Sequence, residues 1–92
     1  MIMEQIRRHI VLYGWVQGVG LRYRAVQAAS LYGVTGWVRN EYDGSVSMEL
    51  QGTEAQIEQV LLAIERASWV RIENMDSRTI PLAENERGFH AR

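Results

Sequence analysis

Residues 6–33 read IRRHIVLYGWVQGVGLRYRAVQAASLYG, and three different local patterns follow one another within them. Residues 6–13 are rich in Ile, Val and Tyr, which predicts a β-strand. A glycine-rich bend follows over residues 14–22. Residues 21–32 are good helix formers with alanines at three- and four-residue spacing, and Gly33 is the expected C-cap. The order is therefore strand, loop, helix.

The next part of the chain predicts a hairpin and a second helix. Residues 34–40 and 45–51 have strand character, and the Asp43-Gly44 pair between them is a strong hairpin signal. Thr53 and Gln56 fit a capping box. The helix that they open carries one apolar stripe and should end near Ala67; the stripe consists of Ile57, Val60, Leu61 and Ile64.

The end of the chain adds a fourth strand that begins at Trp69, a polar loop over residues 81–86 and a short strand over residues 88–92. The order βαββαβ, with this short extra strand, is the split βαβ pattern of an α+β, ferredoxin-like sandwich. Both helices should cover one face of an antiparallel sheet, while the other face stays largely in water. Residues 1–92 form one domain, because the length leaves no room for a second.

The composition is that of an ordinary soluble globular protein, with 47% hydrophobic and 23% charged residues. No apolar run is long enough for a signal peptide or a membrane span, so we expect a cytoplasmic protein without membrane contact. The net charge of −1 argues against general nucleic-acid binding. Arginines give residues 1–40 an excess of positive charge and acids give residues 41–92 the opposite, which suits a small anionic ligand.

Two residue types are absent from the sequence, and each absence excludes one kind of phosphate site. The chain has no lysine, which excludes a phosphate loop of the GK[ST] type, and no cysteine, which excludes a thiol phosphatase. A phosphate site in this chain must therefore depend on arginine and on backbone N–H groups.

The glycine-rich bend is the candidate for such a site. Gly18 and Gly20 let the backbone turn its N–H groups toward one point, and the helix that follows adds its unpaired N–H groups and the positive end of its dipole. Arg22 adds a fixed charge that can bind two phosphate oxygens at once. The alternative is a tight turn with Arg22 in solvent, and the loop alone favours neither.

Asn40 ends the strand before the hairpin, and in a split βαβ fold that end can come close to the first loop. Its amide could then hold a water molecule beside a phosphate bound to Arg22. Alternatively, Asn40 serves only the turn before Asp43-Gly44, since asparagine favours turns and local backbone bonding.

These two segments together resemble the signature of acylphosphatases. The first contributes Gly14, Val16-Gln17-Gly18-Val19-Gly20 and Arg22; the second contributes Gly36-Trp37-Val38-Arg39-Asn40 and Asp43-Gly44-Ser45-Val46. Three residues depart from the family pattern: Trp15 stands where a basic residue is common, Leu21 where phenylalanine is usual, and Arg24 where a smaller or uncharged residue is frequent. The link after the second helix, residues 66–69, also lacks the proline that is often found there.

The resemblance implies an enzyme that hydrolyses small acyl phosphates to a carboxylate and inorganic phosphate, without metal or cofactor. Separately, we expect the chain to be a monomer. The resemblance assigns phosphoryl binding to Arg22 and to the loop N–H groups of Gln17, Gly18, Val19, Gly20, Leu21 and Arg22. Asn40 would orient the attacking water. A non-catalytic module that binds phosphate or carbamoyl phosphate is the alternative function.

Other candidate sites are weaker. His9 and His90 lack neighbouring ligands at metal-binding spacing. Glu41 and Asp43 flank the hairpin, where turn chemistry explains them without a catalytic role. An open sheet face with arginines and aromatic residues could bind RNA, but the chain lacks an RNP1-like motif; the residues concerned are Arg7, Arg8, Trp37 and Tyr42.

Overall fold

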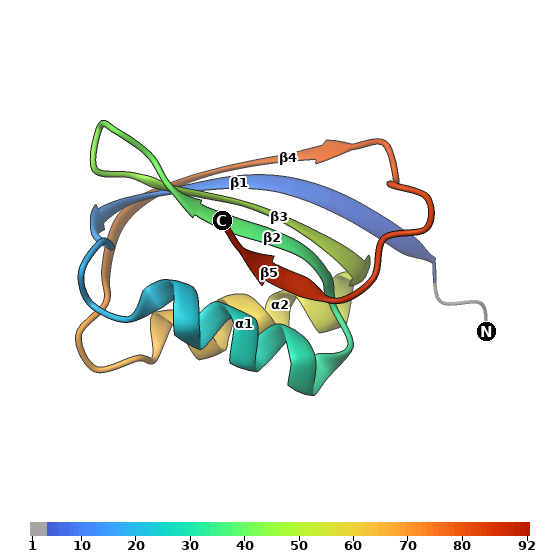
Figure 1. Ribbon diagram of the computed structural model, residues 1–92, viewed down its shortest axis with the longest axis horizontal. Helices are drawn as coiled ribbons and strands as arrows, with labels where there is room; N and C mark the ends of the chain where they lie inside the picture. Colours follow the sequence, from blue (N-terminus) through green and yellow to red (C-terminus); the bar gives the residue numbers. More distant parts are fainter. Residues whose placement is uncertain (1–3) are drawn as a thin grey trace.

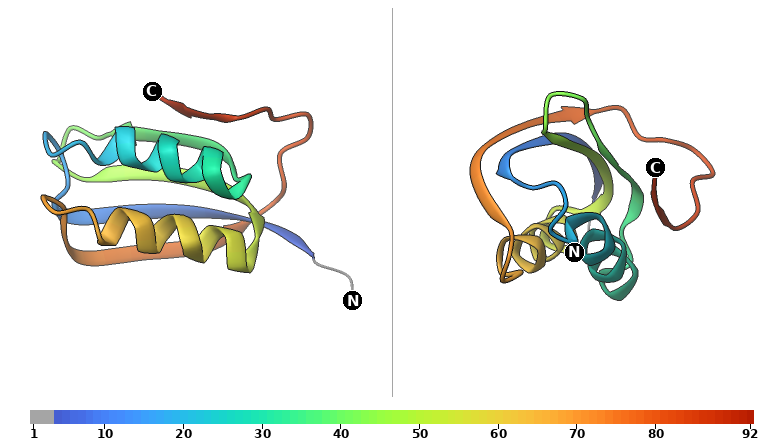
Figure 2. Two further views of the ribbon diagram at one scale, coloured as in Figure 1. Left: turned by 90° about the horizontal axis from the view of Figure 1, so that it is seen from below. Right: turned by 60° about the vertical axis from the view of Figure 1, so that its left-hand side comes forward.

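The structure is a computed structural model that describes residues 4–92 (Figure 1). It contains two helices and five strands: β1 (Gln5–Trp15), α1 (Leu21–Tyr32), β2 (Thr35–Asn40), β3 (Val46–Thr53), α2 (Glu54–Glu65), β4 (Arg71–Ile80) and β5 (Phe89–Ala91). The strands form one sheet in the order β4-β1-β3-β2-β5. Both helices lie on the same side of this sheet, as Figure 2 shows, so the predicted fold class is confirmed.

The sheet differs from the prediction at one edge. β1, β2, β3 and β4 pair antiparallel, but β5 pairs parallel with β2, where Gly36 lies opposite Phe89. The cause is the connection from β4, which carries the chain across to the other edge of the sheet before β5 begins (Figure 1). The sheet is therefore mixed rather than fully antiparallel.

The hydrophobic core lies between the sheet and the helices. Alternate residues of the strands point into it, as the period of two in a strand requires. The buried strand residues are Ile10, Leu12, Val38, Val46, Met48 and Leu50, and the helices add Ala25, Ala28, Ala29, Ile57, Val60 and Ile64.

The helix ends follow local sequence signals. Gly33 caps α1 in the left-handed conformation, with its N–H donated to Ala29 O. At the start of α2, the Thr53 side chain accepts from the Gln56 N–H and the Gln56 side chain accepts from the Thr53 N–H, which confirms the capping box. α2 ends at Glu65, two residues before the predicted Ala67.

β4 begins at Arg71, two residues after the predicted Trp69, and continues to Ile80. Eight of its ten residues are exposed. An edge strand with water on most of its surface has no alternating apolar pattern, so its residues beyond Ile72 gave no strand signal.

The face of the sheet opposite the helices is less exposed than predicted. Arg7 on β1 is only 4% exposed and Trp37 on β2 only 8%. The guanidinium of Arg39 lies 5.2 Å from the centre of the Trp37 ring and that of Arg92 lies 4.7 Å from it, both within cation–π range. Arg7 and Trp37 therefore take part in packing and pairing within the chain.

Gly36 on β2 lies so close to the backbone of β3 that no larger residue fits there. Its φ is +143°, and a β-carbon there would overlap the backbone carbonyl of Glu49 on β3. Gly36→Ala is therefore expected to lower the free energy of unfolding by about 3 kcal/mol or more, through strain and steric overlap. Urea denaturation measures this change.

Gly44→Ala is the matched control, since Gly44 has a φ of +92° with no atom within 4 Å of the added carbon. It should lose only about 1–2 kcal/mol from backbone strain. An equal decrease in the free energy of unfolding in the two variants would contradict the close packing of β2 on β3 at Gly36.

The carboxyl of Glu86 should make stability depend on pH. Hydrogen bonds from Arg7 lower the pKa of Glu86 below its ordinary value of 4.5, so the ionised form stabilises the folded state. This contribution is complete above about pH 4.5 and is lost as the pH falls through the lowered pKa. Glu86→Gln should therefore be less stable than the wild type at pH 6, and the difference should shrink toward pH 3 in thermal melts. A difference that stays constant over this range would contradict the pairing.

Candidate active site

The loop between β1 and α1 has the backbone that an anion site needs. Gly18 and Gly20 adopt left-handed φ values of +71° and +79°, and nothing lies within 4 Å of the position of a β-carbon at either residue. α1 begins directly after Gly20, and its first turn receives no side-chain cap. Its first N–H groups and the positive end of its dipole therefore remain for a ligand.

A hollow of about 430 Å³ opens at this helix start. Arg22 from the first turn of α1 and Asn40 from the end of β2 both line it. The other lining residues are Val16, Gly18, Gly20, Leu21, Tyr23, Val26 and Ala91. Among these lining residues, Arg22 carries a positive charge and none carries a carboxylate. The side chains that line the hollow therefore have a net positive charge.

The sequence-predicted residues are thus partly brought together. Gly18, Gly20, Leu21, Arg22 and Asn40 share the hollow, whereas Gln17 and Val19 do not line it. The side chain of Leu21 is buried in the core, so only its backbone is suited to contact a ligand.

Arg22 is held in place by the end of the chain. Its Nη1 donates to the backbone oxygen of Arg92 at 3.2 Å, just beyond β5. This contact uses one of several N–H donors of the guanidinium and leaves others for a bidentate contact with phosphate. The remaining donors can thus serve a ligand while the side chain stays oriented.

Gln17 has a structural role that the sequence did not reveal. Its side-chain amide donates to Glu41 O at 2.7 Å and to Ser45 O at 2.8 Å, both in the connection between β2 and β3. The loop before α1 is thereby fixed next to the strand end that carries Asn40. A glutamine in a glycine-rich loop gave no signal for partners more than twenty residues away.

The acylphosphatase family model matches residues 8–91, which is most of the chain. The chain belongs to the acylphosphatase family. An acylphosphatase of Bifidobacterium longum is 40% identical over 92 residues, covering 95% of this chain and 92% of the relative. One of Bordetella parapertussis is 47% identical over 84 residues, covering 91% and 82%. The crystal structure of the Bacillus subtilis acylphosphatase superposes with a TM-score of 0.86 at 25% identity, covering 95% of this chain and 98% of that one.

Membership of the acylphosphatase family confirms the predicted activity. The chain is a hydrolase that acts on acyl phosphates and releases a carboxylate and inorganic phosphate. Within residues 4–92, neither helix is long and apolar enough to cross a membrane.

The carboxylates of the acylphosphatase hairpin serve the turn. The Ser47 hydroxyl and the Arg39 guanidinium donate to Glu41 and lower the pKa of its carboxyl. Ser45 donates to Asp43 from both its hydroxyl and its N–H, and this lowers the pKa of Asp43. Both groups are ionised acceptors near neutral pH, and neither lines the hollow with Arg22.

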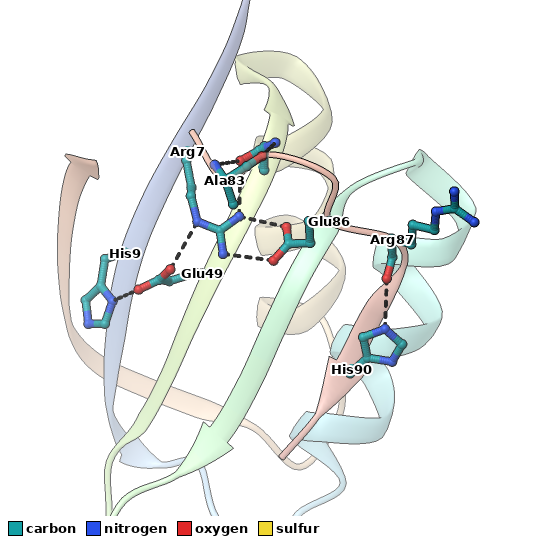
Figure 3. A network of polar contacts seen from close by, with 8 residues as sticks. Arg7, His9, Glu49, Ala83, Glu86, Arg87 and His90 are labelled. Atoms are coloured by element: carbon teal, nitrogen blue, oxygen red, sulfur yellow. Dashed lines mark hydrogen bonds and ion pairs between the residues drawn. The ribbon is translucent and has the colours of Figure 1, made fainter. Parts of the chain in front are cut away.

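The two histidines lie in separate places (Figure 3). His9 Nδ1 is 2.8 Å from a carboxylate oxygen of Glu49, and His90 Nε2 is 2.8 Å from the backbone oxygen of Arg87. Among residues 4–92, no cluster of three or more histidine or acidic side chains is arranged to hold a metal ion.

Proposed function

We propose that Arg22 and the backbone N–H groups of residues 17–22 bind the phosphoryl group, and that Asn40 orients the water that attacks it. The observation that supports this assignment most is that Arg22 and Asn40 line one hollow at the start of α1. Left-handed Gly18 and Gly20 give the loop the curvature of an anion cradle.

The chemistry follows from where charge develops. Water attacks phosphorus, the bond from phosphorus to the acyl oxygen breaks, and the carboxylate leaves with that bonding pair. Charge on the equatorial phosphoryl oxygens must be stabilised in the transition state, and oriented N–H donors and a guanidinium supply that stabilisation. Loss of one such donor costs on the order of 10² to 10³ in rate at comparable sites.

Asn40 can accept a hydrogen bond from water through its amide oxygen but cannot take the proton, since an amide is not basic at neutral pH. In the described part of the chain, residues 4–92, no carboxylate and no histidine line the hollow. We therefore assign the proton of the attacking water to a phosphoryl oxygen of the substrate itself. The products are a carboxylate and monohydrogen or dihydrogen phosphate.

Hydrolysis of acetyl phosphate in water enriched in ¹⁸O tests this mechanism. Attack at phosphorus puts the label in inorganic phosphate, and mass spectrometry should find it there. Label in acetate would overturn the assignment, because it would mean attack at the carbonyl carbon.

We further propose that the chain acts as a monomer in the cytoplasm. The support is its composition and the size of a single domain with its own core. Sedimentation equilibrium at micromolar concentration should give a mass of about 10.6 kDa, and a doubled mass would contradict the proposal.

A further inference from the structure

The connection between β4 and β5 is held on the open face of the sheet by two side chains. Arg7 on β1 donates to both carboxylate oxygens of Glu86, at 2.7 and 3.0 Å. Gln51 on β3 accepts from Ala83 N at 2.8 Å and donates to Ala83 O at 3.1 Å. Figure 3 shows the contact between Arg7 and Glu86 and the position of Ala83 beside it.

Arg7 is a stronger anchor than an ordinary surface ion pair. Its side chain is almost fully covered, and its Nε also donates to Glu49 at 3.0 Å. Bidentate geometry and low exposure make such a pair stronger than exposed pairs, which contribute little. Removal of one partner leaves the other charge poorly solvated.

β5 is only three residues long, so its own pairing with β2 provides few hydrogen bonds. It therefore depends on the anchor between Arg7 and Glu86. Besides its pairing with β2, it is fixed by the bond from Gly36 N to Gly88 O at 3.0 Å and by that from Arg92 N to Val38 O at 2.8 Å. Phe89 packs into the core. Short edge segments with few contacts open locally at low free energy.

β5 in turn reaches the candidate active site. Ala91 lines the hollow, and the backbone oxygen of Arg92 accepts the hydrogen bond from Arg22. A continuous path of hydrogen bonds and covalent chain thus runs from Arg7 through Glu86 and β5 to the guanidinium of Arg22.

We propose that Arg7 is a positioning residue for catalysis: by holding Glu86 it docks β5, and docked β5 orients Arg22 for the phosphoryl group. This inference rests on the proposed role of Arg22. Arg7 itself touches no substrate, because it lies on the face of the sheet away from the helices.

Glu86→Gln and Arg7→Met test the proposal, with Arg8→Met as the matched control. Arg8 is the next residue of β1, and its contact with Glu54 is an exposed pair at 3.5 Å away from β5. In Glu86→Gln, we expect kcat/KM for acetyl phosphate to fall about 10- to 100-fold at a temperature where the variant is fully folded. Arg8→Met should stay within about twofold of the wild type.

Amide hydrogen exchange supplies the readout that separates positioning from general stability. In Glu86→Gln the amides of Gly36 and Arg92, which bond between β2 and the β5 segment, should exchange at least about tenfold faster, while those between β1 and β3 should not change. Arg7→Met should show the same pattern of faster exchange. If Arg7→Met does not fold, Glu86→Gln still tests the proposal, because it removes the same ion pair from the other side.

Coupling to Arg22 gives the decisive comparison. In an Arg22→Ala background, Glu86→Gln should cause no further loss of phosphate affinity, because its effect passes through Arg22. Two results would overturn the proposal. One is unchanged amide exchange at Gly36 and Arg92 in Glu86→Gln, and the other is a full additional loss of phosphate affinity when Glu86→Gln is added to Arg22→Ala. An inactive wild type would instead refute the proposed function, and the exchange data would still decide whether Arg7 docks β5.

Discussion

Arg22→Ala is expected to lose both phosphate binding and turnover, with kcat/KM for acetyl phosphate lower by at least about 10² to 10³. Among residues 4–92, Arg22 carries the only formal side-chain charge that lines the hollow, and the phosphoryl group that we propose it binds is dianionic. Backbone N–H groups of the loop remain in the variant, so the fold of the site survives without its charge. Steady-state hydrolysis and calorimetric titration with inorganic phosphate measure the two losses.

Arg24→Ala is the control for charge and helix position. Arg24 lies two residues further along α1, donates to the backbone oxygen of Ala63 at 3.2 Å and does not line the hollow with Asn40. Its loss should change kcat/KM by no more than about threefold, through weakened electrostatic attraction of the substrate. Comparable losses in both variants would mean that general positive charge, rather than Arg22, binds phosphate.

Asn40→Ala is expected to lower kcat by about 10² to 10³ while the protein stays folded. Asn40 ends β2 and lines the hollow together with the first residues of α1, and its proposed role is to orient the attacking water. Removing its amide leaves the phosphoryl donors in place but the water without an orienting partner. Rapid-quench single-turnover measurements isolate this chemical step.

Asn74→Ala is the matched control for an asparagine at a strand position. Asn74 lies on exposed β4, where its side-chain oxygen accepts the Met75 N–H. It should keep the wild-type kcat. Near-normal turnover in Asn40→Ala would refute the assigned role of its amide.

The fold was predictable from the sequence wherever one face of an element is buried. The alternation at Val46, Met48 and Leu50, the capping box at Thr53 and the C-cap at Gly33 all act over a few residues, so each leaves a local signal. β4 lacks such a signal because water covers most of it. The direction of β5 depends on the path of the connection before it, which no local pattern specifies.

The candidate site was predictable for a similar reason. Glycines with positive φ, a helix start and an arginine are neighbours in the chain, and the topology of the fold brings Asn40 to them. Side-chain contacts between segments that are far apart in the sequence could not be predicted. Arg7 and Glu86 are 79 residues apart, and Gln17 finds its partners 24 and 28 residues away.

In the proposed division of roles, Arg22 binds the phosphoryl group whereas Asn40 acts on the water. Titration of inorganic phosphate into the wild type, Arg22→Ala and Asn40→Ala at one pH and salt concentration tests it most directly. The predicted result is a phosphate Kd for Asn40→Ala within about threefold of the wild type and a Kd for Arg22→Ala raised by about 10² or more. Equal weakening of phosphate binding in the two variants would contradict this division of roles.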